Sequence, residues 1–364
     1  MKKQGIVDGA CLVVIAICLL FGGISLLVVP SPRFSARENR MLAEKPSFTW
    51  QSLTSGSYTA AWESYAAERM PGRDLMRGIY AATELGLGKC EVNGVMRCSD
   101  GSLTKRLTVN ACVYRKNMDT VSKFSATADE MGIPFTACIA PRRMDVRTDI
   151  LPRLYRSDTT AYQSLHEKLP NALVLDGIRG DAAWFRTDHH WTAEGAYAAY
   201  VVLGAQLGYT PHPRADFSPE VVSHAFWGTT DAAAGIIGIT PDTIELWRFS
   251  GDEAFQLIKD GEAAQFSGLY DREKLKTRDG YGVFLGGNAG ITEINLGEQD
   301  TRPTLLVVKD SFANALLPFL ARHYRITAID PRYTAAGPTA LLPTADRALL
   351  LCGMQTLTEI ALCF

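Results

Sequence analysis

Residues 304–330, TLLVVKDSFANALLPFLARHYRITAID, predict a strand, a helix and a second strand in succession. The segments 304–308 and 325–330 have the length of buried strands, and an apolar helical segment separates them. Continuous apolar runs are typical of strands that are covered on both faces. The stretch therefore indicates a mostly parallel sheet with helices on its two sides.

The same alternation extends from about residue 117 to the end of the sequence. Helical spacing of apolar residues alternates there with short apolar runs. We therefore expect a three-layer, mostly parallel α/β sheet with a less regular insert at about 210–300. The further expected strands are 133–140, 172–176 and 348–352, and the expected helices are 118–131, 160–169 and 193–207.

Three parts are expected along the chain. Prolines and mixed charges between residues 30 and 46 indicate a tether. Helical spacing over 58–88, broken at Pro71-Gly72, predicts two helices, and a hairpin of short strands is expected around Asp100-Gly101. The expected division is a membrane anchor at 1–30, a tether with helical and hairpin regions at 31–116, and an α/β domain at 117–364.

Residues 10–29, ACLVVIAICLLFGGISLLVV, carry no charge and are long enough to cross a bilayer core of about 30 Å as a helix. Lys2 and Lys3 precede this segment and favour a cytoplasmic N-terminus. A cleaved signal peptide is the alternative, although the apolar run is longer than a usual signal core and lacks a small-x-small cleavage site. We expect a single-pass membrane protein whose remaining chain is extracytoplasmic.

Composition and charge exclude some classes of protein. With 47% hydrophobic and 21% charged residues, the 364-residue chain is typical of a globular protein. A net charge of −2 without a long basic run argues against a nucleic-acid partner. The cysteines form no CxxC pair that would indicate a zinc site, and the shortest disulfide loops would join Cys90 to Cys98 and Cys352 to Cys363.

The segment richest in chemically active side chains is 185–195, FRTDHHWTAEG, which precedes a predicted helix. Asp188 and His190 are two residues apart in a non-helical turn, so their side chains are expected on one side, with His189 pointing elsewhere. This spacing suits a carboxylate that orients an imidazole acting as general base. Two other interpretations remain open, a polar loop with a packed Trp191 and a metal site, for which the adjacent histidines lack the usual ligand spacing.

Ser311 follows the strand at 304–308 and precedes a helix. A serine at such a strand–turn–helix junction is lifted above the sheet edge, where backbone N–H groups can bind the oxyanion of an acyl-transfer intermediate. The simpler interpretation is that Ser311 or Asp310 caps the helix. Together with the separate Asp188–His190 turn, Ser311 predicts a Ser-His-Asp site.

Further candidate residues follow from the expected sheet. Ligands of open α/β sheets bind beyond the carboxyl ends of the strands. The residues just past the expected strands are therefore candidates for a binding site. They are Arg142, Arg143, Asp176, Ser311, Arg332, Tyr333 and Gly353.

Several motifs resemble the DHHW protein family, whose relatives are the alginate O-acetyltransferase proteins of the SGNH hydrolase-like superfamily. The Asp-x-His pair precedes the serine here, as it does in the alginate acetyltransferases, which is a permutation of the usual SGNH order. Lys309 stands where a Gly-Asp-Ser motif has Gly. The segments that carry the resemblance are 34–40, 71–74, 188–191, 226–229, 309–312 and 330–333.

The resemblance implies roles for individual residues. Asp188 would orient His190, which would act as the base, and Ser311 would be the nucleophile. Asn288 is the best local candidate for an oxyanion donor, with a simple turn as the alternative interpretation. No metal or cofactor is expected. The candidate residues for carbohydrate contact are Arg332, Tyr333 and Trp191. The alternative is that Arg332 and Tyr333 only finish a strand and that Trp191 is a core residue.

The resemblance also implies a function. We expect an extracytoplasmic O-acyltransferase, with acetyl as the expected acyl group, that modifies a cell-surface or exported polysaccharide through an acyl-serine. A multi-span membrane acyltransferase is implied as the partner that supplies the acyl group. Two alternatives stay open, namely an esterase that uses the same triad with water as acceptor, and a non-catalytic glycan-binding scaffold of a polysaccharide-export complex.

Overall fold

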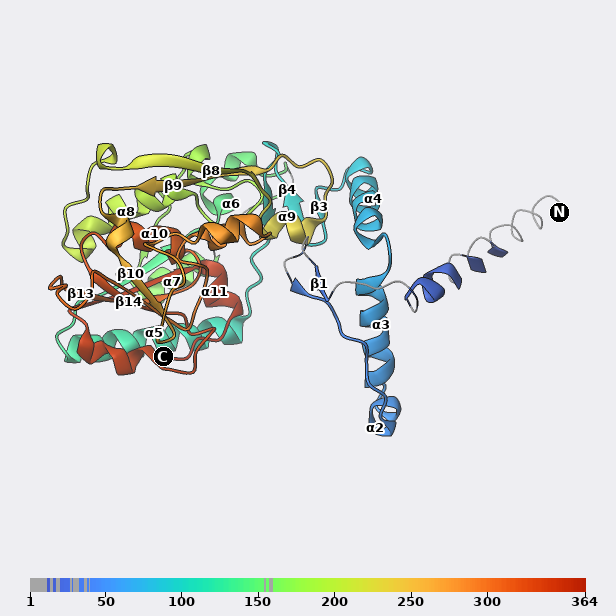
Figure 1. Ribbon diagram of the computed structural model, residues 1–364, viewed down its shortest axis with the longest axis horizontal. Helices are drawn as coiled ribbons and strands as arrows, with labels where there is room; N and C mark the ends of the chain where they lie inside the picture. Colours follow the sequence, from blue (N-terminus) through green and yellow to red (C-terminus); the bar gives the residue numbers. More distant parts are fainter. Residues whose placement is uncertain are drawn as a thin grey trace. The chain divides into compact units, whose positions relative to one another are not determined.

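The computed structural model describes residues 12–13, 16–17, 20–26, 28, 33–35, 38, 40–153, 155–156 and 160–364. The chain divides into two compact units. One unit comprises residues 1–89 and 234–238, and the other comprises residues 90–233 and 239–364. Figure 1 shows the helices and strands of both units.

The unit of residues 1–89 and 234–238 is mainly helical where it is described. The predicted pair of helices is confirmed as α3 (Ser57–Arg69) and α4 (Arg73–Gly86). The helices are separated at Gly72, whose φ of 74° lies in the left-handed region that glycine adopts readily. Glu38 pairs with Arg40 at 2.7 Å and Arg73 at 2.6 Å, which ties the preceding segment to α4. The unit also contains β1 (Phe34–Ser35), β2 (Arg40–Met41) and α2 (Trp50–Thr54).

The predicted membrane anchor, residues 10–29, lies only partly within the described residues. In the part of the chain that the structure describes, no helix combines the length and the apolar character needed to cross a bilayer. The anchor and the extracytoplasmic location therefore stay predictions.

A sheet of eight strands forms the centre of the unit of residues 90–233 and 239–364. The strands are β6 (Phe135–Ala140), β7 (Leu173–Val174), β10 (Gln256–Lys259), β11 (Glu262–Ala263), β12 (Ile291–Asn295), β13 (Thr304–Lys309), β14 (Arg325–Ile329) and β15 (Arg347–Gly353). Their order is β11-β10-β12-β14-β13-β15-β6-β7, and the strands from β14 to β7 run parallel. The prediction of an α/β fold with a large, mostly parallel sheet is confirmed.

Helices cover both faces of this sheet (Figure 1). They are α8 (Ala193–Leu207) and α10 (Ala313–Leu320) on one face, and α5 (Ala111–Glu130), α7 (Thr160–Lys168) and α11 (Met354–Glu359) on the other. Successive side chains of a strand point to opposite faces. In β13, Val307 therefore packs into the core with α8 and α10, whereas Val308 packs into the core with α5 and α11.

The segment predicted as a less regular insert, 210–300, is more ordered than expected. It contains the hairpin of β8 (Ser218–Phe226) and β9 (Asp242–Arg248), and its strands β10, β11 and β12 extend the central sheet by antiparallel pairing. Burial alternates along β12, ITEIN, where the polar Thr292 and the apolar Ile294 are the buried residues. A search for continuous apolar runs does not detect strands of this kind.

A separate antiparallel sheet consists of β3 (Glu91–Val92), β4 (Val95–Arg97) and β5 (Leu103–Lys105). The predicted hairpin around Asp100-Gly101 is confirmed as the turn between β4 and β5. The remaining short helices are α6 (Arg143–Val146), α9 (Thr229–Ala234), η1 (Thr148–Ile150), η2 (Asp181–Ala183), η3 (Arg214–Asp216), η4 (Asp252–Ala254), η5 (Arg272–Lys276), η6 (Gly280–Val283) and η7 (Pro338–Thr344).

The two suggested disulfides are absent, because the cysteines outside the apolar N-terminal segment are all free thiols in this structure. Cys352, on β15, is buried among apolar side chains, whereas Cys363 is exposed. Cys98 is likewise buried, whereas Cys90 is only partly so. Nearness in sequence was a poor guide, since the members of each pair lie in different environments.

Candidate active site

A cavity of about 200 Å³ lies at the carboxyl ends of the parallel strands. Residues that follow β6, β13 and β14, together with the end of β15, contribute to its lining, as expected for a parallel sheet. Of the residues predicted from the strand ends, those that line the cavity are Arg142, Arg143, Ser311, Arg332 and Gly353, and those that do not are Asp176 and Tyr333.

Ser311, His190 and Asp188 form a continuous line of hydrogen bonds at this cavity. Nε2 of His190 lies 2.8 Å from Oγ of Ser311, and Nδ1 of His190 lies 2.5 Å from Oδ1 of Asp188. Asp188 and His190 are only 4% and 5% exposed, so bulk water is largely excluded from their contact. The fold thus brings together three predicted site residues, although Ser311 is 121 positions from His190 in the sequence.

Each carboxylate oxygen of Asp188 accepts two hydrogen bonds. Oδ1 accepts from the backbone N and from Nδ1 of His190, and Oδ2 accepts from N and Oγ1 of Thr229 at 2.7 and 2.9 Å. Burial by itself would raise the pKa of Asp188, but the neighbouring histidines and these hydrogen bonds outweigh it and hold the pKa well below its usual range. The ionised carboxylate favours a proton on Nδ1 of His190, which leaves Nε2 able to accept one.

Asp242, at the start of β9, fixes the loop that carries Asp188. Its carboxylate accepts hydrogen bonds from the backbone N of Arg186 at 2.9 Å and from N and Oγ1 of Thr187 at 2.8 and 2.6 Å. Oγ1 of Thr187 accepts in turn from the backbone N of Gly228 at 3.0 Å. The β8–β9 hairpin therefore positions the Asp-x-His turn.

The imidazole of His190 is packed against aromatic rings. The ring of Tyr281 stacks on it with centroids 3.9 Å apart and an interplanar angle of 5°, and Phe312 meets it edge-on at 5.1 Å. The hydroxyl of Tyr281 donates to the backbone O of Ser311 at 3.2 Å. Burial, reinforced by the negative charge of Asp188, raises the pKa of Tyr281 well above its usual value, so the phenol remains a neutral donor.

Asp310 fixes the turn that carries Ser311. Its Oδ1 accepts from the backbone N of Phe312 at 2.9 Å, and its Oδ2 accepts from N of Gly353 and Oγ1 of Thr356, both at 2.7 Å. These bonds tie the turn to the end of β15 and to α11. No acceptor for the backbone N–H of Ser311 is found among the described residues, so this donor is available to an oxyanion.

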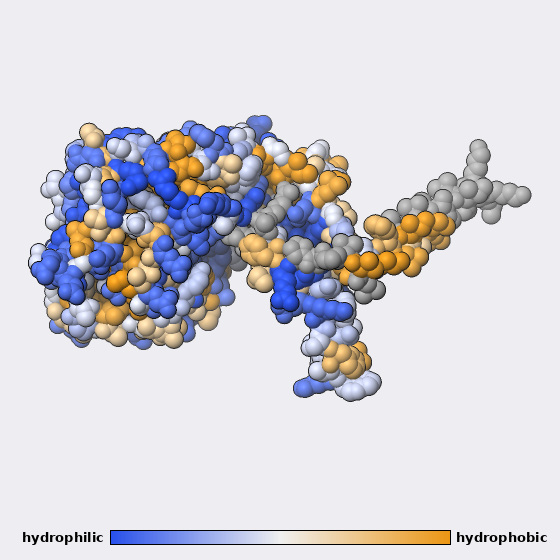
Figure 2. Space-filling model, in the orientation of Figure 1, coloured by the Kyte–Doolittle hydropathy of each residue, from blue (hydrophilic) through white to orange (hydrophobic). Residues whose placement is uncertain are grey.

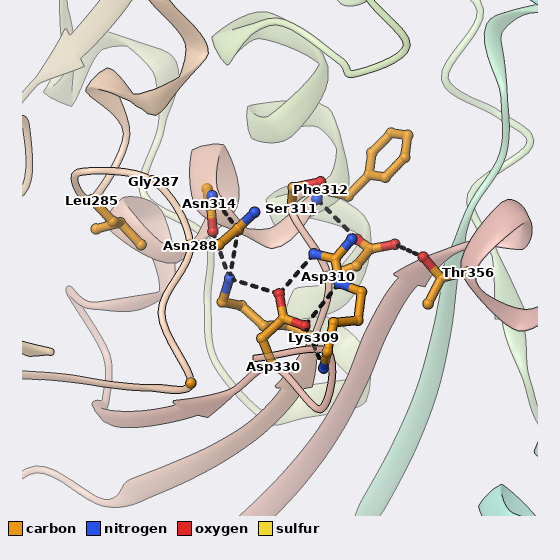
Figure 3. Close-up of polar contacts among 12 residues, drawn as sticks. Leu285, Gly287, Asn288, Lys309, Asp310, Ser311, Phe312, Asn314, Asp330 and Thr356 are labelled. Carbon is orange, nitrogen blue, oxygen red and sulfur yellow. Dashed lines mark hydrogen bonds and ion pairs between the residues drawn. The ribbon is translucent and has the colours of Figure 1, made fainter. Parts of the chain in front are cut away.

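Asn288 lies in the loop before β12 and is surrounded by polar side chains from β13 and α10 (Figure 3). Its Oδ1 accepts from Nζ of Lys309 at 3.3 Å and from Nδ2 of Asn314 at 3.0 Å. Because both donors meet the oxygen, the orientation of the amide is fixed and its nitrogen faces the other way. Figure 3 shows the Asn288 side chain turned toward Ser311, which makes it the side-chain candidate for an oxyanion donor.

The three predicted carbohydrate contacts have different environments. Arg332 lines the cavity, while its Nε and Nη2 pair with the carboxylate of Asp330 at 2.8 and 2.7 Å. Tyr333 is 58% exposed but lies outside the cavity lining. Trp191 is fully buried and donates through Nε1 to the backbone O of Phe312 at 3.0 Å. Trp191 therefore supports the serine turn and cannot meet a ligand in this conformation.

Lys105, from β5, adds a cation to the cavity wall beside Arg142 and Arg143. Arg142 pairs with Asp145 at 2.6 Å and Arg143 with Asp100 at 2.7 Å. For the ammonium of Lys105, the described residues supply no carboxylate within ion-pair distance. Its charge therefore faces the cavity without a counter-ion from the described chain.

The described residues contain one group of three side chains with metal-ligand geometry, Asp188, His189 and His190, whose ligand atoms lie within 4.8 Å of one another. Nδ1 of His190 and Oδ1 of Asp188 are already hydrogen-bonded to each other. A metal between them would break the contact that orients His190 toward Ser311. The geometry therefore suits hydrogen bonds that link Asp188, His190 and Ser311 better than it suits metal ligation.

Sequence reasoning missed several residues of the site. Tyr281 and Asp242 lie in the segment at 210–300 and belong to no motif that would have marked them. Thr229 belongs to the Gly-Thr pair that carries part of the family resemblance, so a signal for its position was present. Lys105 ends a short strand of the separate sheet, and nothing in the local sequence links it to the cavity.

Comparison with known proteins places these features in context. The family described as "DHHW protein" matches residues 78–329. A solved structure of a DHHW family protein from Eubacterium siraeum DSM 15702 is 20% identical with a TM-score of 0.61, and the match covers 74% of this chain and 93% of that chain. PatB1 of Bacillus cereus, solved with a sulfonyl adduct, is 18% identical with a TM-score of 0.59, covering 73% and 96%. These structures share the fold, and no curated protein matches the sequence.

Proposed function

This chain belongs to the DHHW protein family, and on that premise we propose that it is an O-acyltransferase that moves an acyl group, with acetyl as the expected group, through Ser311 to a hydroxyl of a polysaccharide. The observation that carries the proposal is the line of hydrogen bonds from Ser311 through His190 to Asp188 at the edge of a cavity. A serine, a base and an orienting carboxylate in this order are the groups that acyl transfer requires.

In the first half-reaction, Oγ of Ser311 attacks the carbonyl carbon of the acyl donor while its proton passes to Nε2 of His190. Asp188 stabilises the imidazolium that forms. The negative charge that develops on the carbonyl oxygen meets the backbone N–H of Ser311 and the amide N–H of Asn288. The donor's leaving group departs with the proton from His190, and an acyl-Ser311 ester remains.

In the second half-reaction, a sugar hydroxyl enters the cavity and gives its proton to Nε2 of His190 as its oxygen attacks the acyl-Ser311 ester. The tetrahedral intermediate is stabilised by the same two donors, and its collapse returns the proton to Oγ of Ser311. The free wall of the cavity includes Lys105 and Arg332, whose donors suit an acceptor rich in hydroxyl groups.

The proposal is tested by intact mass of the protein after brief exposure to 4-nitrophenyl acetate. We expect an acetyl-sized adduct on the wild type and none on Ser311→Ala or His190→Ala. Because PatB1 was solved with a sulfonyl adduct, a sulfonyl fluoride is a second probe that should compete with acetylation. A folded wild-type protein that forms neither adduct nor free acetate would overturn the proposal and favour the glycan-binding scaffold.

Transfer and hydrolysis differ only in the acceptor of the acyl group. Acetylated protein incubated with and without an oligosaccharide acceptor separates them, because a transferase yields acetylated sugar whereas an esterase yields free acetate at the same rate in both cases.

We further propose that the site works outside the cytoplasm and receives its acyl group from a multi-span membrane acyltransferase. Protease accessibility in intact cells tests the location, and loss of glycan acetylation on deleting that partner tests the donor.

A further inference from the structure

Lys309 is a buried cation directly before the serine turn. It ends β13, is 3% exposed and occupies the position where a Gly-Asp-Ser motif has glycine. Its Nζ donates to Oδ1 of Asn314 at 2.8 Å and to Oδ1 of Asn288 at 3.3 Å, and lies 3.8 Å from Oδ2 of Asp330 (Figure 3). Burying an ammonium costs free energy even when hydrogen bonds and an ion pair offset most of that cost. This cost indicates that the contacts of Lys309 serve a function.

The contacts of Lys309 fix the orientation of the Asn288 amide. Lys309 and Asn314 both donate to the oxygen of Asn288, and Asn314 is itself held by the ammonium through its own oxygen. A donor that carries a positive charge draws electron density toward the amide oxygen, which strengthens the opposite N–H as a donor. The described residues offer no acceptor to that N–H, and it is directed toward Ser311 (Figure 3).

The loop that carries Asn288 is held from its other side by a second lysine. Leu285, Gly286 and Gly287 have consecutive φ values of 59°, 69° and 81°, which for the leucine is an unfavourable left-handed conformation. Nζ of Lys259 donates to the carbonyl oxygens of these three residues at 3.2, 2.9 and 3.2 Å. A strained segment and two partly or fully buried ammonium groups thus fix the position of a single side chain.

We propose that Lys309 is a positioning residue that holds and polarises the Asn288 amide as the oxyanion donor of Ser311. The inference rests on the proposed acyl transfer, and it assigns a function to the lysine that replaces the motif glycine. Lys309 does not touch the substrate. Its positive charge polarises the amide of Asn288, and the N–H of that amide donates to the oxyanion.

The charges around Lys309 permit this function. Asp330 already pairs with both nitrogens of the Arg332 fork, so its charge is shared and does not neutralise Lys309 alone. Asp310, from the serine turn, and Lys259 are the other charged groups nearby. Burial, partly offset by Asp330, lowers the pKa of Lys309 to about 8. The ammonium is therefore charged at neutral pH and loses its proton within the range in which esterase activity can be measured.

The experiment is a double-mutant cycle on the burst and steady-state turnover of 4-nitrophenyl acetate. Asn288→Ala is expected to lower kcat on the order of 100-fold, as the loss of one oxyanion donor does. Lys309→Met, which keeps an unbranched side chain one atom shorter and removes the charge, is expected to lower kcat about tenfold with little change in KM. In the Asn288→Ala background the same lysine substitution should change kcat less than about twofold, because the two residues act in series.

The dependence of kcat on pH tests whether the charge of Lys309 matters, because a purely structural role of Lys309 would leave that dependence unchanged. Wild-type kcat should fall as pH rises through about 8, where Lys309 loses its proton, and this alkaline limb should be missing from Lys309→Met. Lys276→Met, a substitution of an exposed lysine, is the matched control and should keep the wild-type profile. If Lys309→Met does not fold, Lys309→Gln, which keeps a neutral donor, takes its place in the cycle.

The outcomes separate this inference from the proposed function. A wild-type burst that Ser311→Ala abolishes establishes the acyl-serine independently of Lys309. Given that burst, equal losses from the lysine substitution with and without Asn288 would overturn the inference, as would an unchanged alkaline limb. Absence of both an acetyl adduct and turnover in folded wild-type protein would instead remove the proposed function, and this inference with it.

Discussion

Gly228 lies against the carboxylate of Asp188, which orients the base His190 in the proposed mechanism. A Cβ at this position would be 2.3 Å from Cβ of Asp188 and 2.4 Å from its Oδ2. Neither atom can move freely, because Oδ2 accepts two hydrogen bonds from Thr229 and Oδ1 contacts His190. The glycine is therefore required by space rather than by a backbone angle.

Gly228→Ala is expected to displace Asp188 from His190. We predict a fall in kcat/KM for 4-nitrophenyl acetate on the order of 100-fold, since small misplacements of reacting groups have effects of this size, and a loss of unfolding free energy of about 1–3 kcal/mol. The matched control is Gly180→Ala, where φ is −63° and no atom lies within 4 Å of the added Cβ. A Gly228→Ala enzyme as active as the control would show that the contact does not position the carboxylate.

At the scale of residues, the sequence was informative where chemistry is local. The spacing of Asp188 and His190, the strand–turn–helix position of Ser311 and the family resemblance together predicted that these side chains meet, and Nε2 of His190 lies 2.8 Å from Oγ of Ser311. Tyr281 could not be predicted, because its stacking on His190 depends on a short helix about 90 positions away with no motif of its own. Trp191 is conspicuous in the sequence, yet it is buried, since a large ring next to the Asp-x-His turn serves packing as readily as binding.

The interface between α8 and the turn after α10 contains a titratable pair. Oη of Tyr200, on α8, lies 2.7 Å from Nε2 of His323, which follows α10, and the ring of His212 lies 5.0 Å from that of His323. Burial, and then the neighbouring His212, lower the pKa of His323 to about 4. The folded protein therefore keeps this imidazole neutral at pH values at which the unfolded chain, with a pKa of about 6.5, is protonated.

This difference sets the direction of a pH effect on stability. Between about 6.5 and 4 the unfolded state binds the proton and the folded state does not, so the stability due to His323 is complete above 6.5 and is lost as pH falls toward 4. We predict that His323→Gln, which keeps an acceptor for Tyr200, loses less unfolding free energy than the wild type between pH 7 and 5 in urea titrations. His224→Gln, at an exposed position on β8, should keep the wild-type slope. A wild-type slope in the His323 variant would contradict the prediction.

The helices and strands that were located best from the sequence are those that are most fully buried. Strands with continuous apolar runs, such as β13 and β15, and the helix at 193–207 were located to within a residue or two, because an element buried on both sides needs apolar residues throughout. The strands β10 and β12, which lie between β11 and β14 in the sheet, escaped notice because their buried residues form no continuous run. Asn288, in the loop before β12, was a candidate from its local sequence even though the strand after it was missed.

The side chains of the proposed mechanism all lie outside the first 89 residues of the chain. The unit of residues 90–233 and 239–364 contains the central sheet, both apolar cores and every side chain named in the proposed mechanism. On the face that Figure 2 shows, hydrophilic and hydrophobic residues are mixed. In the described part of the first unit, α4 leaves Leu75, Ile79 and Tyr80 more than half exposed. Among the described residues, no side chain of the first unit takes part in the hydrogen bonds between Ser311, His190 and Asp188.

A chain that begins at Cys90 should consequently fold and form the acyl-serine. A domain of about 270 residues buries enough surface to be stable alone, and the hydrogen bonds of Asp188, His190 and Ser311 all lie within it. We predict cooperative thermal unfolding by circular dichroism and an acetylation rate with 4-nitrophenyl acetate within about twofold of the full chain, given that the reacting groups keep their geometry. Ser311→Ala in the same fragment is the control for non-specific acetylation. A fragment that unfolds cooperatively but is not acetylated, when the full chain is, would show that the first 89 residues complete the site; one that does not fold would show that they stabilise it.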